Sequence, residues 1–360
     1  MIEQTFFTKM GAPQTKKELF LSACRFQPVD RVPVWIMRQA GRYLPDYQAV
    51  RAKHSFLEIC KTPELAAEVS LQPLRVLDVD AAIVFSDILI VAEAMGLPLA
   101  VPDSGPVLSN PVRDVAVIRA LRNFDPARET RFVGDAIRLI CKQAGPEVPV
   151  IGFAAAPWTL ACYMIEGQTR GDVSRAKAML RENPEAVREL LGRIARATVG
   201  YLRMQIDAGA SVVQLFDTWA TELTPEQYRE FELPVTRSII EALAGTGAVR
   251  ILFAKGSAKH LESMAASGTD VVSVDAETDL AATRKALGRR CALQGNVDSE
   301  ILLRTEDEVR EAVAKAIQKT GGQGHVLNLG HGILPGTPVR NAQAFVEAAR
   351  QMLPAAASGQ

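Results

Sequence analysis

Side chains that bind anions or stabilise charge follow several short apolar runs of the sequence. Arg38 and Arg42 lie four residues apart after the first run, Asp87 follows the second, and His331 lies between two glycines after the last. Arginine binds carboxylates through paired hydrogen bonds, and a fixed carboxylate stabilises a positive charge that develops beside it during a reaction. These residue types therefore predict a site for a small molecule that carries carboxylates.

From the spacing alone, each of these residues also has a structural interpretation. Arg38 and Arg42 can form a solvated pair on the first turn of a helix, although two cations in one short loop need anions nearby. Asp87 can cap the following helix, and Tyr163 can be a core ring whose hydroxyl is satisfied by the backbone. His331 can be structural, although its flanking glycines let the backbone approach a ligand closely.

Lys255 follows the fifth apolar run and has two chemical interpretations. It can form a Schiff base with a carbonyl substrate or pair with Asp275, and we favour the pairing. The usual motifs for nucleotides and metals are missing, because the sequence has no glycine-rich dinucleotide loop after the first run, no Walker lysine, no H-E-x-x-H motif and no paired set of cysteines and histidines. We therefore expect a site that works without a cofactor or a metal.

Eight runs rich in β-branched and aliphatic residues alternate with longer segments of helical periodicity. They span residues 32–37, 81–85, 148–153, 211–216, 250–254, 271–274, 291–294 and 326–329. Most are continuously apolar, as parallel strands buried on both faces should be. Helix starts are predicted at Pro63, Pro225 and Glu306, each directly after a threonine. The pattern predicts an α/β fold, a (β/α)8 barrel of the TIM type, although a doubly wound sheet has the same alternation.

The elements predict one catalytic barrel domain over residues 1–360. Residues 1–30 form a short N-terminal extension with a helix near Lys16 to Cys24, and the stretch from Gly96 to Pro111 is an insertion with the composition of a small hairpin. The small, polar residues 354–360 are expected to fray as a flexible tail. In a barrel the residues after the strands gather at one end, which is where the polar side chains described above should meet.

The composition limits the partners and the compartment of the protein. Forty-one basic residues balance 41 acidic ones, so no overall field favours nucleic acid or an anionic membrane. The five cysteines are odd in number and scattered, which indicates reduced thiols. The first residues lack the pattern of a secretory signal, and no apolar stretch is long enough to span a membrane. We therefore expect a cytoplasmic protein.

Two long segments of the sequence resemble the signature regions of the uroporphyrinogen decarboxylase family. They are Pro33-Val34-Trp35-Ile36-Met37-Arg38-Gln39-Ala40-Gly41-Arg42-Tyr43 and Gly152-Phe153-Ala154-Ala155-Ala156-Pro157-Trp158-Thr159-Leu160-Ala161-Cys162-Tyr163-Met164-Ile165-Glu166-Gly167. Shorter segments around Asp87, Asn296 and His331 also match, so the resemblance covers the chain from about residue 17 onward. It implies a homodimeric barrel that needs no cofactor and converts the four acetate arms of the tetrapyrrole uroporphyrinogen III to methyls, which gives coproporphyrinogen III.

The resemblance also implies which residues act. Those assigned to catalysis are Asp87, Arg38 and Tyr163, and those assigned to substrate binding are Arg38, Gln39, Arg42, Asp87, Tyr163, Phe216, Thr218 and His331. Asp87 would hold the pyrrole N–H groups and stabilise the protonated ring, the arginines would bind carboxylates, and Phe216 would pack against the macrocycle. The family position at Thr218 is often serine, so threonine keeps the hydroxyl and adds a methyl group. Arg38 is the first candidate for the proton donor.

Two other functions remain as alternatives. A related group of barrels transfers methyl groups to cobalamin or corrinoid proteins through a zinc-bound thiolate, which needs a His-x-Cys pair and a second cysteine. The corresponding strand end here is Lys255-Gly256-Ser257, which has no thiol. The second alternative is a tetrapyrrole carrier without catalysis, and release of carbon dioxide distinguishes an enzyme from such a carrier.

Overall fold

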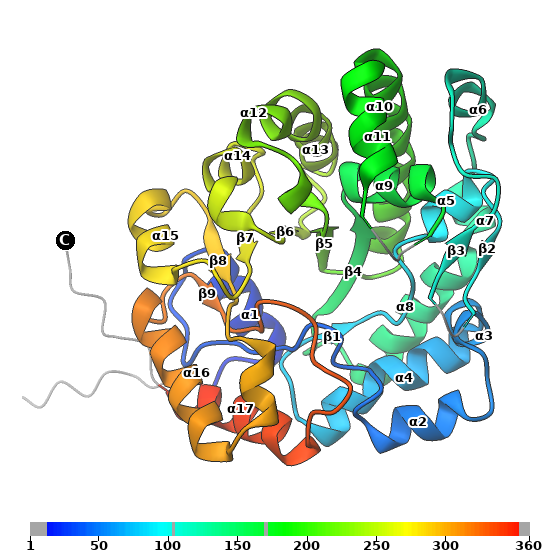
Figure 1. Ribbon diagram of the computed structural model, residues 1–360. Helices are drawn as coiled ribbons and strands as arrows, with labels where there is room; N and C mark the ends of the chain where they lie inside the picture. Colours follow the sequence, from blue (N-terminus) through cyan, green and yellow to red (C-terminus); the bar gives the residue numbers. More distant parts are fainter. Residues whose placement is uncertain (1–12, 103–104, 169–171, 353–360) are drawn as a thin grey trace, which may run out of the picture.

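The structure, a computed structural model, describes residues 13–102, 105–168 and 172–352, and its main sheet is parallel and curled (Figure 1). The seven strands are β1 (Ala82–Ile83), β4 (Val150–Ala155), β5 (Val212–Asp217), β6 (Val249–Ala254), β7 (Val271–Val274), β8 (Ala292–Gln294) and β9 (His325–Val326). Each strand pairs in parallel with the next strand in this order. Since the order never reverses, the α/β-barrel prediction is confirmed, and the doubly wound alternative does not apply.

The first predicted run, residues 32–37, joins the two ends of the sheet without forming a regular strand. Val34 makes a single parallel bridge to Leu327, and the Leu327 N–H donates to the Pro33 carbonyl at 2.8 Å. On the other side, the N–H of Asp80, just before β1, donates to the Val34 carbonyl at 2.8 Å. Pro33 has no N–H to donate, so the ladder stays short. The segment therefore lies between β9 and β1, where the eighth strand of a barrel belongs.

A buried ion pair fixes this closing segment against β1. Asp80 has no exposed surface, and its two carboxylate oxygens accept hydrogen bonds of 2.6 Å from the Arg31 guanidinium. One of them also accepts from the Val34 N–H at 2.8 Å. A buried charge that is paired in this two-pronged way and hydrogen-bonded to the backbone is well satisfied. These contacts therefore fix the direction in which the chain continues from this segment toward Arg38.

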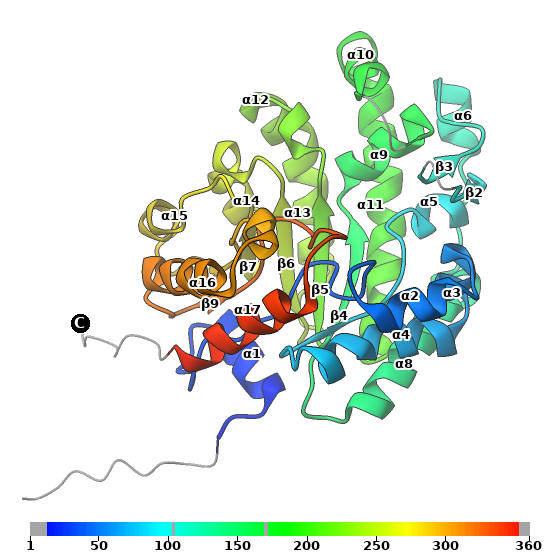
Figure 2. The same cartoon turned by 60° about the horizontal axis from the view of Figure 1, so that its bottom comes forward.

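Helix α1 (Lys16–Cys24) packs beneath the strands and begins with a capping box between Thr15 and Glu18. Phe20, with no exposed surface, belongs to an inner cluster formed with the first residues of the strands. Figure 2 shows α1 below the strands, at the end opposite to α9 and α10. The sequence predicted this helix as part of an extension. In the described residues 13–30 it instead completes the floor of the barrel, because its apolar face covers the open bottom.

The other helices surround the sheet (Figure 1). The α-helices are α2 (Pro45–Arg51), α3 (Phe56–Lys61), α4 (Pro63–Val76), α5 (Ile90–Ala94), α6 (Val115–Ala120), α7 (Pro126–Glu129), α8 (Arg131–Ala144), α9 (Pro157–Glu166), α10 (Ser174–Glu182), α11 (Pro184–Asp207), α12 (Pro225–Gln227), α13 (Leu233–Ala242), α14 (Leu261–Ala266), α15 (Leu280–Leu287), α16 (Glu306–Thr320) and α17 (Val339–Gln351). Short 3-10 turns are η1 (Ala220–Glu222), η3 (Ser257–Lys259) and η4 (Ser299–Leu303), and η2 (Tyr228–Glu232) is a π-helical turn. The three predicted helix starts are confirmed, since α4, α12 and α16 begin at those residues.

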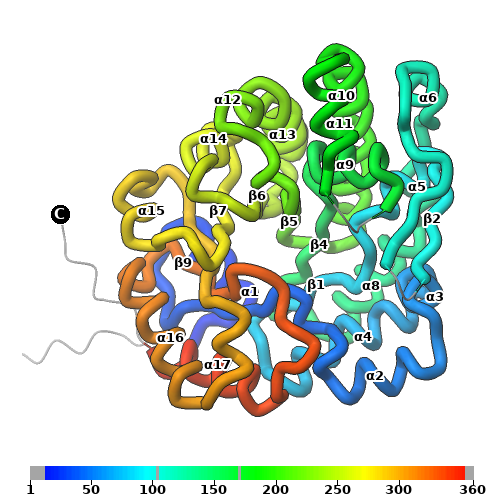
Figure 3. Tube along the Cα trace, in the orientation of Figure 1, coloured from blue at the N-terminus to red at the C-terminus, as the bar shows by residue number. Residues whose placement is uncertain are grey.

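The predicted insertion is also confirmed. β2 (Leu99–Ala100) and β3 (Val107–Leu108) form an antiparallel two-stranded sheet inside the stretch from Gly96 to Pro111. Figure 3 traces the chain from the blue segment before β1 around to the orange segment after β9, and the two pass side by side. The predicted flexible tail, residues 354–360, lies outside the described residues.

A layer of polar side chains lies inside the barrel above the apolar floor. The Gln294 amide donates to Gln214 Oε1 at 3.0 Å and to Ser273 Oγ at 2.9 Å, and its oxygen accepts from the Trp35 indole N–H at 2.9 Å. None of these four residues has exposed surface. Connected hydrogen bonds of this kind strengthen one another in a dry interior and fix the side chains in one arrangement. The layer thus provides a rigid base beneath the residues at the carboxyl ends of the strands.

Candidate active site

The turn after the closing segment is held in an unusual backbone conformation by buried amides. Arg38 has a φ of 62°, a region that residues other than glycine adopt at a cost when the surroundings fix them there. The side chain of Asn328 accepts from the Met37 N–H at 2.9 Å, and the Met37 carbonyl accepts from the Ile333 N–H at 2.9 Å. The turn is therefore tied to the loop that contains His331.

Gln39, predicted to bind substrate, has a different position. Its side chain has no exposed surface, its oxygen accepts from the Ile36 N–H at 3.1 Å, and its amide donates to the Ala81 carbonyl at 2.9 Å. Both ends of the amide are thus used by the backbone of this turn and of the strand beside it. Gln39 therefore shapes the loop that presents its two arginines, and its assignment to substrate binding stays a prediction.

The two arginines of this loop are exposed and have no acidic partner. Among the residues that the structure describes, neither the Arg38 nor the Arg42 guanidinium forms an ion pair or donates a side-chain hydrogen bond. Two unpaired guanidinium groups in one loop are suited to carboxylates of a ligand. The alternative of a solvated helical pair does not fit, since residues 38–42 form a turn before α2.

Asp87 caps a turn with one oxygen only. Its Oδ1 accepts from the Leu89 N–H at 2.7 Å, and Oδ2 has no hydrogen-bond partner in the described part of the chain. Burial raises the pKa of Asp87 to about 6, while the Leu89 N–H and the positive charge of Arg38 act in the opposite direction. Asp87 is therefore a largely ionised carboxylate near neutral pH, half-buried beside Arg38, with one oxygen free for a ligand.

Tyr163 lies on α9 and is close to the same two groups. Burial raises its pKa, and the charges of Asp87 and Arg38 act on it in opposite directions. Its ring meets the Trp219 ring edge-on, with the centroids 6.2 Å apart. No backbone group is hydrogen-bonded to its hydroxyl within the described residues, so the interpretation as a satisfied core ring is not supported. At neutral pH its phenol keeps the proton and can donate a hydrogen bond.

His331 lies near this group in the loop after β9, between two glycines that other parts of the chain approach closely. A Cβ at Gly330 would clash with the backbone nitrogen of Ala276, whereas a Cβ at Gly332 would meet only the side chain of Arg38. Burial and the nearby charges of Arg38 and Lys255 lower the pKa of His331 to about 4. The imidazole is therefore neutral at physiological pH and can donate one hydrogen bond.

Aromatic rings form a floor next to these polar groups. Phe216 on β5 contacts Phe153 at 5.6 Å between centroids and Phe253 at 6.0 Å, and Phe253 in turn lies 6.4 Å from the His331 ring. Phe216 and Thr218 are half-buried, which leaves part of each accessible from the barrel mouth. The predicted residues Arg38, Asp87, Tyr163, Phe216 and His331 thus lie at one end of the barrel, and Thr218 follows β5 at that same end.

Lys255 does not pair with Asp275, contrary to the interpretation that we favoured. The Asp275 carboxylate accepts from the Gly256 N–H, from Ser257 Oγ at 3.1 Å and from Thr278 Oγ1 at 2.6 Å. These three neutral donors fold the strand ends of β6 and β7 together and occupy both carboxylate oxygens. Lys255 forms no ion pair within the part of the chain that the structure describes.

Two acidic side chains that the sequence analysis did not predict as a pair lie between the sheet and the helices outside it. Asp217 and Glu232 have no exposed surface. Burial raises the pKa of both, and the nearby charge of Asp217 raises the pKa of Glu232 further. Asp217 accepts from Thr159 Oγ1 at 2.6 Å, and Glu232 accepts from the Trp158 N–H at 2.8 Å. The pair thus holds the first turn of α9, whose later residue Tyr163 reaches the site. In the sequence, Asp217 directly follows an apolar run, as a polar residue at a strand end does. The residues around Glu232 form no pattern that predicts a buried acid there.

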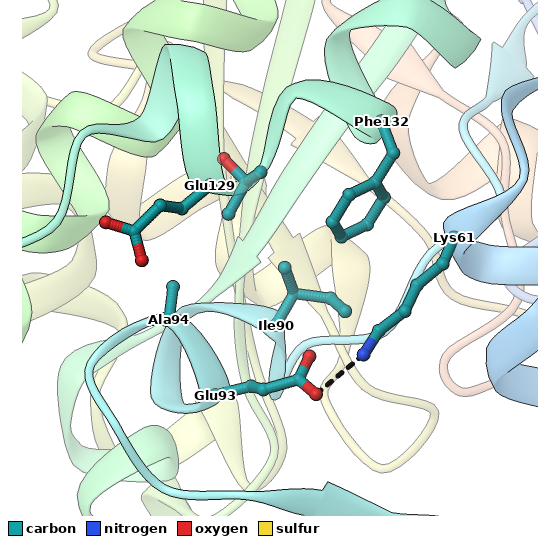
Figure 4. A pocket seen from close by; sticks show the side chains of 7 residues that line it. Lys61, Ile90, Glu93, Ala94, Glu129 and Phe132 are labelled. Carbon is teal, nitrogen blue, oxygen red and sulfur yellow. Dashed lines mark hydrogen bonds and ion pairs between the residues drawn. The ribbon is translucent and has the colours of Figure 1, made fainter.

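A small surface pocket is lined in part by α5, the helix that follows Asp87 (Figure 4). Its lining comes from α3, α5, α7 and the start of α8, and the Lys61 ammonium pairs there with Glu93 at 2.6 Å. It contains none of the predicted site residues. Residues 13–102, 105–168 and 172–352 contain no cluster of three or more His, Cys, Asp or Glu side chains placed to hold a metal ion. Within the same ranges no helix is both long and apolar enough to span a membrane.

Comparison with known families gives a match over nearly the whole chain. A family model described as "Uroporphyrinogen decarboxylase (URO-D)" matches residues 15–352. The chain is 47% identical over 346 residues to the uroporphyrinogen decarboxylase of Alkalilimnicola ehrlichii, which covers 94% of this chain and 95% of that protein. It is 46% identical over 335 residues to the protein of the same name from Geobacter metallireducens, with 92% and 98% covered.

Solved structures share the fold at lower sequence identity. A methyltransferase from Methanosarcina mazei has a TM-score of 0.77 and 22% identity, and the match covers 94% of this chain and 99% of that one. A B12-independent methionine synthase from Shewanella sp. W3-18-1 has a TM-score of 0.55 and 12% identity, with 80% and 88% covered. At these identities the likeness extends to the barrel fold and not to the chemistry.

Proposed function

Because the chain belongs to the uroporphyrinogen decarboxylase family, we propose that it removes the four acetate carboxyl groups of uroporphyrinogen III and forms coproporphyrinogen III, a carboxy-lyase reaction of tetrapyrrole and heme biosynthesis. The observation that supports the proposal best is the position of Asp87. Its free oxygen lies beside the unpaired Arg38, close to Tyr163, and its carboxylate is ionised at neutral pH. A carboxylate next to cations that bind anions is what the reaction requires.

The chemistry needs a place for the electrons that the departing carboxylate leaves behind. An electron-rich pyrrole cannot accept them until a ring carbon has gained a proton, which makes the ring a cation delocalised onto nitrogen. The bond between the methylene and the carboxylate then breaks, carbon dioxide leaves, and the electron pair neutralises the ring. A second proton converts the exocyclic methylene to a methyl as the ring carbon loses its added proton, so one proton is consumed for each acetate.

Asp87 is assigned to the cationic stage of this sequence. Its free oxygen accepts hydrogen bonds from the pyrrole N–H groups, and its negative charge stabilises the protonated ring as the ring forms. A charge held in a half-buried site needs no reorganisation of solvent when the cation develops. The raised pKa shows that burial already disfavours the carboxylate, so a cationic neighbour has more effect on it than it would in open water.

The remaining predicted residues are assigned to binding and proton supply. Arg38 and Arg42 bind substrate carboxylates, neutral His331 and Thr218 donate single hydrogen bonds, and Phe216 packs against the macrocycle. Arg38 is the proposed proton donor, resupplied from solvent, since His331 holds no spare proton at neutral pH and burial raises the pKa of Tyr163. An Arg38→Lys variant that kept normal activity and an unchanged pH-rate profile would remove Arg38 from this role.

Methyl transfer is an alternative function, because a methyltransferase has the same barrel fold. A zinc-thiolate mechanism needs cysteines at the carboxyl ends of the strands. In the described chain, four of the five cysteines are buried, and Cys141, the fifth, lies on α8 outside the sheet. The strand end with Lys255 and Ser257 has hydroxyl and amine groups in place of thiols. These features favour decarboxylation.

The test is a direct assay. Purified protein is incubated with anaerobically reduced uroporphyrinogen, carbon dioxide is measured, and the oxidised products are separated by their number of carboxylates. We expect intermediates with seven, six and five carboxylates and a final product with four. Binding without release of carbon dioxide would instead identify a carrier. We also propose that the protein acts in the cytoplasm as a homodimer with one catalytic domain per chain, which sedimentation and cell fractionation can check.

A further inference from the structure

The ammonium group of Lys255 belongs to the inner face of the barrel. On β6, the alternate residues Val249 and Ile251 are part of the inner cluster, and Phe253 contacts Phe216 and His331. Because side chains alternate along a strand, the next residue in this series, Lys255, continues the inner row at the barrel mouth. Its N–H donates to the Asp217 carbonyl at 3.0 Å, so the backbone keeps the strand register at this point.

Lys255 is an exposed cation without an anion. Several lysines of this chain form ion pairs, among them Lys61 with Glu93 and Lys319 with Asp279. The strands on either side of β6 end near Asp217 and Asp275. Asp217 accepts from Thr159, and three neutral donors already occupy the oxygens of Asp275. An unpaired lysine at the end of a barrel strand has the position that ligand-binding residues take in this fold.

The charge of Lys255 is felt by a residue already assigned to the site. After burial, the positive charges of Arg38 and Lys255 are the largest causes that lower the pKa of His331. The three side chains come from three different parts of the barrel: Arg38 from the closing segment, Lys255 from β6 and His331 from the loop after β9. Asp275 also acts on His331, but its oxygens accept hydrogen bonds from three neutral donors. Donors that converge from separate strands in this way are suited to bind an anion.

We propose that Lys255 binds a side-chain carboxylate of the tetrapyrrole next to His331, as a third cation of the substrate site. The inference rests on the proposed function. Uroporphyrinogen brings eight carboxylates, whereas the predicted residues include two cations, Arg38 and Arg42, so most of the negative charge has no cationic partner. A carboxylate loses much free energy when it leaves water without a partner, and an ammonium on a flexible stem can follow it as the macrocycle turns between successive decarboxylations.

The first experiment compares steady-state kinetics of Lys255→Gln, Lys255→Arg and a matched control, Lys259→Gln. Lys259 is an exposed lysine four residues further on, in η3, and its charge acts on His260 instead of His331. We expect Lys255→Gln to raise KM for uroporphyrinogen about tenfold, the size expected when one charge-assisted hydrogen bond is lost, and to leave kcat within about twofold. Lys255→Arg should recover most of the affinity, and Lys259→Gln should behave as wild type.

Two readouts that do not need turnover accompany the kinetics. Equilibrium binding of uroporphyrin, with eight carboxylates, should weaken in Lys255→Gln and show a smaller dependence on salt, because one fewer cation contacts the ligand. The NMR titration of His331 should move to higher pH in Lys255→Gln and stay unchanged in Lys259→Gln, since the first variant removes a nearby positive charge.

The outcomes separate this inference from the proposed function. If the wild type decarboxylates uroporphyrinogen and Lys255→Gln keeps its KM, its uroporphyrin affinity and its His331 titration, the subsite is wrong and the function stands. A wild type that releases no carbon dioxide overturns the proposed function, whatever the variants do. A fall in kcat with unchanged KM would also overturn the subsite, because it would place Lys255 at the reacting centre instead of at a bound carboxylate.

Discussion

The half-buried Asp87 and the fully buried pair of Asp217 and Glu232 differ in what surrounds them. Asp87 lies at the end of the barrel where the strands have their carboxyl ends, Arg38 provides a positive charge there, and one carboxylate oxygen is free. Asp217 and Glu232 lie between the sheet and the helices outside it, and no cation pairs with either in the described chain. Burial raises the pKa of all three acids, so burial alone does not distinguish Asp87 in the candidate site from the two acids that hold α9.

The difference shows how position decides the use of a carboxyl group. Near Arg38, the carboxylate form of Asp87 is retained at neutral pH and its charge can act on a ligand. Behind the sheet, two acids that repel each other favour the protonated form, and their oxygens serve as hydrogen-bond partners for Thr159 and Trp158 at the start of α9. One acid is adapted to stabilise charge, and the other two to hold a helix.

The same substitution at both places should have opposite results. Asp87→Asn removes the charge that the cationic intermediate needs, and we expect kcat to fall at least 100-fold, about 3 kcal/mol in the barrier, with the fold unchanged by circular dichroism. Asp217→Asn keeps an oxygen for Thr159 and should retain kcat within about threefold. If Asp87→Asn kept a tenth of the rate, or if both variants lost activity equally, the division of roles would be wrong.

The pH dependence of the reaction should reflect Asp87 and not the pair behind the sheet. The pKa of Asp87 is about 6, so its active carboxylate is lost as the pH falls through that value. We expect kcat/KM to decrease about tenfold per unit below pH 6, since this ratio reports groups of the free enzyme. Asp217→Asn should show the same acid limb as the wild type. A profile that stays flat down to pH 4 would contradict the assignment.

The sequence predicted most of this arrangement where a local pattern and a resemblance agreed. Seven of the eight predicted runs overlap a strand of the barrel sheet, and the motif residues Arg38, Asp87, Tyr163 and His331 come together at one end. The remaining features depend on contacts across the fold. Gln39 stands in a signature loop, and only its partners Ile36 and Ala81 reveal that its amide serves the backbone.

Long-range partners also explain the two other differences. Lys255 and Asp275 follow neighbouring strands, which made a pair plausible, but the Gly256 N–H and two hydroxyls reach the carboxylate first. The local sequence could not predict the role of Glu232, because that role depends on its contact with Asp217. Asp217 is fifteen residues away in sequence and lies on another element. A pattern read along the chain detects which residues face inward, and does not show which partner each polar side chain will find.

Loss of the contact between the acid pair and α9 should have a moderate effect on both stability and rate. Thr159 links Asp217 to the backbone of the next turn, since its hydroxyl donates to Asp217 and accepts from the Trp219 N–H at 3.0 Å. Thr159→Val leaves these groups unsatisfied, and we expect unfolding by urea to show a loss of about 2 kcal/mol. Because Tyr163 lies on the same helix, kcat should fall about fivefold. Thr236→Val, on the Glu232 side of the pair, is the matched control and should lose stability without the loss of rate.

The smallest expected effect is a gain of stability that depends on pH. The folded-state pKa of Glu232 is raised, so its contribution to stability is fully present below the unfolded value near 4 and is lost as the pH rises through the folded value. Glu232→Gln keeps a neutral amide at this site and does not titrate. Its free energy of unfolding, measured with urea, should therefore exceed that of the wild type more at pH 8 than at pH 5, by an amount on the order of 1 kcal/mol. Its kcat should stay within twofold, because the variant still accepts from the Trp158 N–H. A wild type that gains stability relative to Glu232→Gln as the pH rises would show that Glu232 is ionised and favourably paired, and the contrast with Asp87 would then have to be abandoned.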